Sequence, residues 1–136
     1  MMSKSSFSQR ILLATGLSFA IAAGAVELNQ PQSENGISYI SGGVGEGSEQ
    51  AMREIAGQYN LHLTFAAADG SYLADIPVTI QDGKGNAVLD TVSPGPLFYA
   101  NLTPGSYTVA ASANGKTQTK RVEVQAHSAR SLNFAW

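Results

Sequence analysis

The spacing of the hydrophobic residues changes once along the chain, near residue 60. Before that point Met52, Ile55 and Tyr59 recur at intervals of three and four residues, which is the spacing of one face of an α-helix. The pattern therefore predicts one short α-helix over residues 48–60.

Polar residues mark the start of this helix. Ser48 is the expected N-cap, because its hydroxyl can accept a hydrogen bond from a free backbone N–H of the first turn. Glu49 falls in the first turn, where a negative charge is favourable, and Arg53 follows four residues later. At this spacing Glu49 and Arg53 are expected to form an ion pair.

From Leu61 to Trp136 apolar and polar residues alternate in short runs separated by turn residues. Alternation with a period of two is typical of strands with one buried face. Asn114-Gly115 is the strongest hairpin signal, since a type I′ turn needs positive φ at both central positions. These features predict a seven-stranded antiparallel β-sandwich over residues 61–136. The seven runs are residues 61–65, 76–80, 87–92, 97–102, 107–111, 117–124 and 131–136.

Two of these runs carry residues typical of the edge of a sheet. Pro77 lies inside the run 76–80, and proline lacks the N–H that an inner strand donates, so we expect an edge strand there. Lys120 and Arg121 lie in the run 117–124, where charge would protect an edge from pairing with another chain.

The segment before the helix is polar and rich in glycine. Residues 26–36 contain Pro31 and show little periodicity, and residues 42–47 are mostly glycine. Only residues 37–40 fit a short strand. We therefore predict a flexible polar leader over residues 26–47.

The first 25 residues have the order of a secretory signal peptide. Lys4 and Arg10 precede an apolar run over residues 11–22, and small residues follow at 23–25. The run is shorter than the ~20 residues that span a bilayer. We predict cleavage after Ala25, with cleavage after Ala22 or Ala23 as alternatives. The mature protein would be periplasmic or secreted, with no stable membrane span.

The composition of the mature chain limits the classes of partner that it can bind. There is no cysteine, so its core must hold it together without disulfides. The predicted signal peptide contains two of the eight basic residues and none of the ten acidic ones, which leaves six against ten, a net charge of −4. Such a chain lacks the basic surface that nucleic acids need, so nucleic acid is excluded as a partner.

One stretch resembles a known family. Leu102, Pro104, Gly105, Tyr107 and Val109 match the leucine, Pro-Gly and Tyr-x-Val core of carboxypeptidase regulatory-like domains, which are transthyretin-like sandwiches of seven strands. The resemblance covers about residues 61–136 and implies an accessory role, structural support or binding, and no turnover.

No residue pattern for catalysis or cofactor binding stands out. His62 and His127 are the only histidines, and we expect both at the surface, without the further ligands that a metal site needs. Residues 42–48 lack the lysine of a phosphate-binding loop. We predict no catalytic, cofactor-binding or metal-binding residue. The alternative, a hydrolase on a transthyretin-like scaffold, requires His62, His127 and a carboxylate to meet in space.

A second alternative comes from Leu132, Phe134 and Trp136, whose spacing resembles the terminal aromatic pattern of outer-membrane barrels. Barrel strands need about 9–11 residues, whereas most runs here are nearer six. The closing strand of a sandwich is therefore the favoured interpretation.

The remaining prediction is a binding surface for a protein or a glycan. Pro94 and Pro96 form a rigid loop beside Phe98 and Tyr99, and aromatic rings beside a rigid loop can form a platform for a ligand. Alternation leaves at most one of the two rings exposed. We expect a non-enzymatic exported module that binds through these residues or through an exposed edge strand, which could accept a foreign strand.

Overall fold

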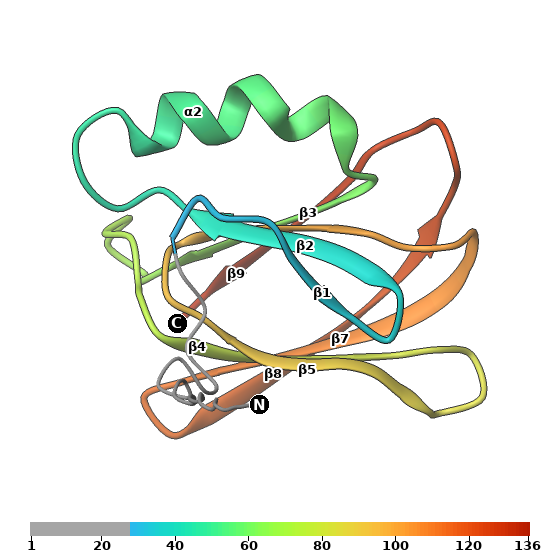
Figure 1. The fold of residues 1–136 in the computed structure, drawn as a ribbon. Coiled ribbons are helices and arrows are strands. Elements are labelled where there is room, and N and C mark those ends of the chain that lie inside the picture. Colours follow the sequence, from blue (N-terminus) through green and yellow to red (C-terminus); the bar gives the residue numbers. More distant parts are fainter. Residues whose placement is uncertain (1–27) are drawn as a thin grey trace, which may run out of the picture.

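The computed structural model describes residues 28–136, so the predicted signal peptide lies outside the described residues. In this part of the chain nine strands form two sheets, with one α-helix followed by a 3-10 turn (Figure 1). The elements are β1 (Gln32–Glu34), β2 (Ile37–Gly42), α2 (Ser48–Ile55), η3 (Ala56–Gln58), β3 (Leu61–Ala66), β4 (Ile76–Gln81), β5 (Ala87–Ser93), β6 (Leu97–Asn101), β7 (Gly105–Ala113), β8 (Lys116–Val124) and β9 (Arg130–Ala135).

The two sheets pack face to face. The first has the strand order β1-β2-β6-β3-β9 and the second the order β5-β4-β7-β8. The prediction of a mainly β fold with one short helix is confirmed, but the prediction of seven strands is wrong, because residues 28–136 form nine. The prediction of a wholly antiparallel fold is also wrong, because β3 and β9 pair in parallel, with Leu61 opposite Arg130.

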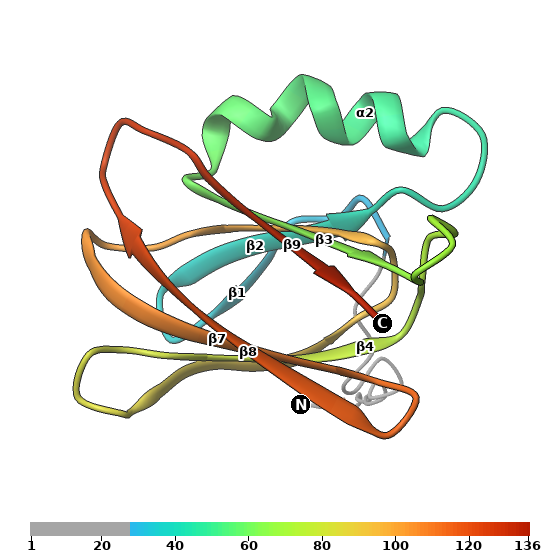
Figure 2. The same ribbon diagram turned by 180° about the vertical axis from the view of Figure 1, so that it is seen from behind.

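The parallel pair follows from how the chain changes sheets. β8 ends in the second sheet near the point at which β3 begins in the first, and a short connection, residues 125–129, then leads to β9. The chain therefore enters the first sheet beside β3 and in the same direction (Figure 2). A hydrogen bond from Arg130 N–H to the Asn60 carbonyl, 3.0 Å long, fixes this entry point.

The two strands beyond the predicted seven lie in the predicted leader, and β2 contains the short strand that we expected over residues 37–40. β1 and β2 form a hairpin whose turn residues, Asn35 and Gly36, have φ of 52° and 77°. β2 then pairs with β6, with Tyr39 opposite Ala100. Positive φ at both central positions is what an Asn-Gly dipeptide favours. Residues 32–42 are thus part of the first sheet, unlike the flexible segment that we expected.

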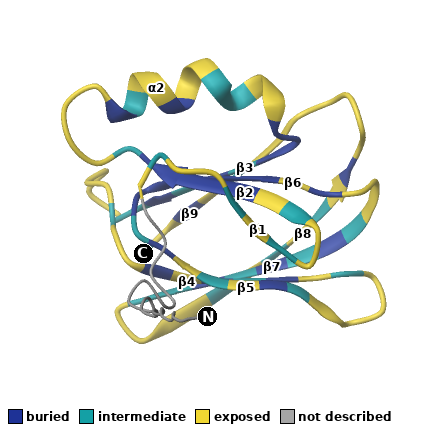
Figure 3. Cartoon of the chain, in the orientation of Figure 1, coloured by how far each residue is buried: buried dark blue, intermediate teal, exposed yellow. Residues whose placement is uncertain are grey.

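The core lies between the two sheets and consists of the residues that point inward, which are every second residue along a strand. β3 and β4 alternate strictly, with Leu61, Leu63 and Phe65 buried in β3 (Figure 3). Phe134 of β9 packs 5.8 Å from Phe65, measured between ring centroids, and Trp136 lies 6.1 Å from Phe134. Burial of these side chains contributes about 1.5–3 kcal/mol each.

A second, smaller cluster lies on the outer face of the first sheet, under α2. Met52 and Tyr59 pack there against Ile40, Leu97 and Tyr99. The predicted helix is therefore present, and its apolar stripe covers a sheet face.

None of the helices in the described part of the chain is long and apolar enough to cross a membrane.

The helix starts differently from our prediction. The N-cap is Gly47, with φ of 81°, and the Ser48 side chain makes no capping hydrogen bond. The Ser48 hydroxyl instead accepts a 2.7 Å hydrogen bond from Gly43 N–H and donates one of 3.0 Å to Asn29 Oδ1. Ser48 thereby fastens the glycine-rich loop and the segment before β1 to the start of the helix.

The edge strands agree with one prediction and contradict the other. β8, which carries Lys120 and Arg121, is an outer strand as predicted. β4, which carries Pro77, lies between β5 and β7, so the prediction of an edge there is wrong. Proline is tolerated because the pairs between β4 and β7 begin only at Val78, opposite Ala111.

On both sides of the sandwich, side chains from one sheet reach backbone groups at the edge of the other sheet. On one side Asn35 Nδ2 donates to the Val88 carbonyl over 3.0 Å, and Asp90 N–H donates to Glu34 Oε2 over 2.9 Å. Side chains at the end of β1 and in the β1–β2 turn therefore form hydrogen bonds with two backbone groups of β5, an outer strand of the second sheet. Covering an edge in this way hinders pairing with another chain.

The other side is covered from β8. Lys120 Nζ donates to the Asn133 carbonyl over 2.6 Å, and Gln118 Nε2 donates to the Ala135 carbonyl over 2.5 Å. Both carbonyls belong to β9, the outer strand of the first sheet. These two carbonyls therefore already have partners, which hinders the pairing of a foreign strand with this part of β9.

Candidate binding site

The predicted aromatic platform is not at the surface. Phe98 is 0 % exposed and Tyr99 6 %, Pro96 is also buried, and Pro94 is half-buried. Phe98 faces the core and stacks on Tyr39 at 5.4 Å between ring centroids. Tyr99 faces the opposite side, where α2 covers it. The prediction is wrong because both faces of β6 are covered, which alternation within β6 cannot reveal.

The Pro94–Pro96 loop is a packed connection. Gly95 N–H donates to Ser41 Oγ over 3.1 Å, and Ser93 Oγ donates to the Gly95 carbonyl over 2.7 Å. A Cβ atom at Gly95 would lie only 2.3 Å from the Gly42 carbonyl oxygen. The loop is thus locked against β2 and is not available as a separate surface.

An exposed aromatic ring lies at the same end of the sandwich, where α2 begins. Tyr72 is 51 % exposed and belongs to the connection between β3 and β4. Its backbone forms a bridge with Ala66, and the next residue, Leu73, donates its N–H to the Phe65 carbonyl over 3.1 Å. The backbone therefore holds Tyr72 at a fixed position beside the end of β3.

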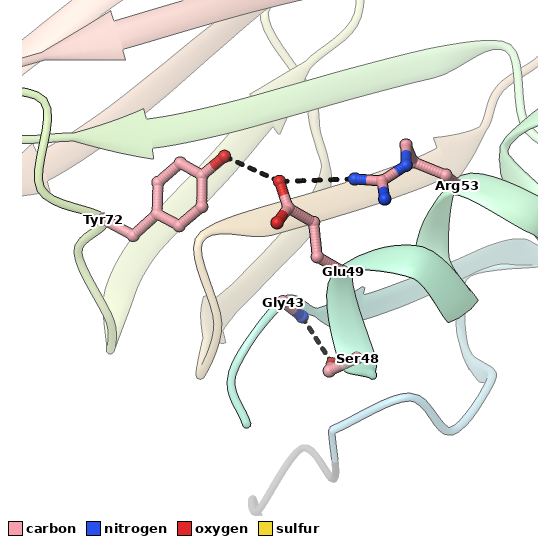
Figure 4. A network of polar contacts seen from close by, with 5 residues as sticks. All are labelled: Gly43, Ser48, Glu49, Arg53 and Tyr72. Atoms are coloured by element: carbon pink, nitrogen blue, oxygen red, sulfur yellow. Dashed lines mark hydrogen bonds and ion pairs between the residues drawn. The ribbon is translucent and has the colours of Figure 1, made fainter. Parts of the chain in front are cut away.

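The side chain of Tyr72 is fixed as well, by residues of α2 (Figure 4). Its hydroxyl donates a 2.9 Å hydrogen bond to Glu49 Oε2, and Arg53 Nη1 lies 3.4 Å from the same oxygen. The ion pair between Glu49 and Arg53 that the helix spacing predicted is confirmed. We call Glu49, Arg53 and Tyr72 the tyrosine cluster.

The carboxylate of Glu49 favours the protonated form of the tyrosine. The hydrogen bond to Glu49 raises the pKa of Tyr72 above its ordinary value, and partial burial and the negative charge of Glu49 act in the same direction. Burial raises the pKa of Tyr99, which lies near these same charges. The contact with Glu49 therefore keeps Tyr72 in its protonated, hydrogen-bond-donating form to a higher pH than an ordinary tyrosine.

The two histidines lie apart from this cluster. His62 is half-buried and not at the open surface that we expected: its Nε2 lies 2.8 Å from the Ala56 carbonyl oxygen and 3.0 Å from that of Tyr59. Because both partners are acceptors, Nε2 carries a proton. His127 is exposed in the connection between β8 and β9. Within residues 28–136 no group of three or more histidine, aspartate or glutamate side chains could hold a metal ion.

Sequence reasoning identified the Glu49–Arg53 pair but missed Tyr72. The available signal was the turn Ala68-Asp69-Gly70-Ser71, directly before the tyrosine. Asp69 Oδ1 accepts a 2.9 Å hydrogen bond from Ser71 N–H, as expected of aspartate in a turn. A large aromatic residue directly after such a turn, and outside the alternating runs, is a candidate for exposure.

Fold and site together define a small two-sheet β protein with a helix on one outer face and an exposed tyrosine cluster where that helix begins. The sequence matches no model of a known protein family and no curated protein.

Proposed function

We propose that this chain is a non-enzymatic, exported β-sandwich module that binds a partner protein through the tyrosine cluster. The observation that carries the proposal is the exposed ring of Tyr72, held from α2 by its hydrogen bond to Glu49. An aromatic side chain that is already fixed loses little conformational freedom on binding. Tyrosine and arginine are also the residue types that most often dominate protein interfaces.

The charges around the cluster favour a protein with basic groups at its contact surface. Glu46 and Glu54 lie beside the cluster in sequence and are exposed, so this segment holds three acidic residues and one basic residue. Complementary charge speeds the encounter of two proteins and limits the choice of partner. A glycan, the other expected class, gains nothing from this charge.

The sequence supports the remaining parts of the proposal. The basic residues and apolar run within residues 1–25 favour export, and the carboxypeptidase regulatory-like pattern from Leu102 to Val109 favours an accessory role. The alternative, a hydrolase, needs His62, His127 and a carboxylate to meet. His62 instead contacts the carbonyls of Ala56 and Tyr59, and His127 is exposed between β8 and β9.

Partner capture followed by calorimetry tests the proposal. Proteins from the periplasm or medium of the exporting cell are captured on the immobilised chain, and each is then purified and titrated against the chain and its variants. We expect Tyr72→Ala to weaken binding of the true partner by at least about tenfold, the cost of a modest interface hot spot. Tyr72→Phe, which keeps the ring, should have a smaller effect.

Val92→Ala is the matched control, because Val92 is also an exposed large side chain but lies on β5. It should leave the affinity unchanged. If every captured protein binds Tyr72→Ala and Arg53→Ala as tightly as the unaltered chain, the tyrosine cluster is not a binding site.

A further inference from the structure

A hollow opens at the opposite end of the sandwich, where the helical segment stops. Its volume is about 420 Å³, and it lies between η3, the end of β6 and the connection between β8 and β9. Pockets of about 300–1,000 Å³ are typical of small-molecule sites. The hollow is therefore large enough for a ligand and is distant in the fold from the tyrosine cluster.

A buried asparagine builds the floor of this hollow. Asn60 is 5 % exposed, and its Oδ1 accepts a 2.9 Å hydrogen bond from Leu102 N–H. Its Nδ2 donates to the Leu102 carbonyl over 2.8 Å and to the Gln125 carbonyl over 3.2 Å. One side chain thus joins the segment after η3 to the ends of β6 and β8, so the hollow is fixed before any ligand arrives.

The side chains that line the hollow and face solvent are polar. Gln58, Asn101, His127 and Ser128 are all exposed. Among residues 28–136 the side chains of Gln58, Asn101 and His127 have no hydrogen-bond partner of their own. Two amides, one imidazole and one hydroxyl supply both donors and acceptors.

This lining selects one class of ligand. It contains no lysine or arginine to hold an anion and no carboxylate to hold a cation. Tyr59 is the one aromatic residue of the lining and is buried, so it offers little ring surface to an apolar ligand. A ligand with many hydroxyl groups and no charge matches a set of neutral donors and acceptors. We propose that this hollow binds a neutral saccharide, independently of the tyrosine cluster.

Side-chain amide signals in NMR spectra test this second site directly. The full chain, labelled with ¹⁵N, is titrated with glucose, galactose, mannose, N-acetylglucosamine and their 1,4-linked disaccharides. At least one should shift the amide signals of Gln58 and Asn101 in a saturable way. Its uronic acid counterpart, which adds a carboxylate, should bind more weakly.

Variants complete the test. Gln58→Ala combined with Asn101→Ala should weaken saccharide binding by about tenfold or more, since each change removes hydrogen bonds to the ligand. Both residues are exposed, so the variant should keep its circular dichroism spectrum and melting temperature. Gln50→Ala, which removes an exposed glutamine from α2, should leave binding unchanged.

One further variant distinguishes saccharide binding at this site from the proposed binding of a partner protein. Tyr72→Ala should bind the saccharide normally even if it loses its partner protein. The inference is overturned if no neutral saccharide shifts the two amide signals, if the double variant binds as well as the unaltered chain, or if the uronic acid binds more tightly.

Discussion

Replacing Asn60 by alanine should destabilise the whole domain, although the change removes only one small polar side chain. Three backbone groups depend on it: the N–H and carbonyl of Leu102, and the carbonyl of Gln125. Leu102 is itself buried, so water cannot easily replace the lost partner. The perturbation therefore leaves two buried backbone groups without partners and one that is partly exposed.

The magnitude follows from these contacts. An unsatisfied buried donor or acceptor costs about 1–3 kcal/mol. Two such groups at Leu102 give roughly 2–6 kcal/mol, and the partly exposed Gln125 carbonyl adds little because water can reach it. For a domain whose free energy of unfolding lies in the usual range of about 5–15 kcal/mol, this is a large fraction.

Urea unfolding measures the loss conveniently, because Trp136 is the single tryptophan and packs against Phe134 and Phe65 at the far end of the first sheet. Its fluorescence reports on global unfolding, at a distance from the mutated site. Asn101→Ala is the matched control: Asn101 is exposed, so its loss should change the free energy of unfolding by less than about 0.5 kcal/mol. The reasoning fails if Asn60→Ala costs no more than this control.

Three further predictions concern other parts of the molecule. Because Glu49 raises the pKa of Tyr72, their contact should stabilise the fold below the ordinary tyrosine pKa of about 10. This stabilisation should be lost as the pH rises through the folded pKa of Tyr72. An absorbance titration should show a lower midpoint for Tyr72 in Glu49→Gln, and an unchanged midpoint would contradict this prediction. Gly95→Ala should lower the free energy of unfolding by about 1–3 kcal/mol in urea, because its Cβ would lie 2.3 Å from a backbone carbonyl oxygen of β2. Gly57→Ala should be tolerated, because no atom lies within 4 Å of the added Cβ. Equal losses of stability in the two variants would refute the steric argument. Lys120→Ala should free a carbonyl on the outer edge of β9 and promote self-association. Self-association would appear as a sedimentation coefficient that rises with protein concentration. A constant sedimentation coefficient would show that this edge needs no lysine to prevent self-association.

Local patterns predicted much of the fold because they depend on near neighbours. The intervals between Met52, Ile55 and Tyr59 located the helix, and alternation located β3 to β9. The β1–β2 hairpin was also readable, since Asn35-Gly36 repeats the dipeptide that marked Asn114-Gly115. It was missed because the segment around it is polar and glycine-rich.

The errors arise where a residue's environment comes from a distant part of the chain. One of Phe98 and Tyr99 was expected at the surface, but Phe98 lies in the core and α2 covers Tyr99. Pro77 was expected at an edge, but β7 pairs beside β4 from the next residue onward. The tyrosine cluster has the same origin, because Tyr72 and Glu49 come from separate elements that only the folded chain brings together.

The parallel pairing of β3 with β9 also bears on when the protein can fold. β3 lies between β6 and β9 in the first sheet, so this sheet is incomplete until β9 has joined it. Pairings between segments far apart in the sequence form slowly, because a long loop must close before any contact is gained. While β9 is still missing, a chain synthesised from its N-terminus can therefore pair only the four strands β1, β2, β6 and β3 of this sheet, and one edge of β3 stays unpaired. The late arrival of β9 should therefore delay completion of the core, because Phe134 of β9 packs 5.8 Å from Phe65 of β3, measured between ring centroids.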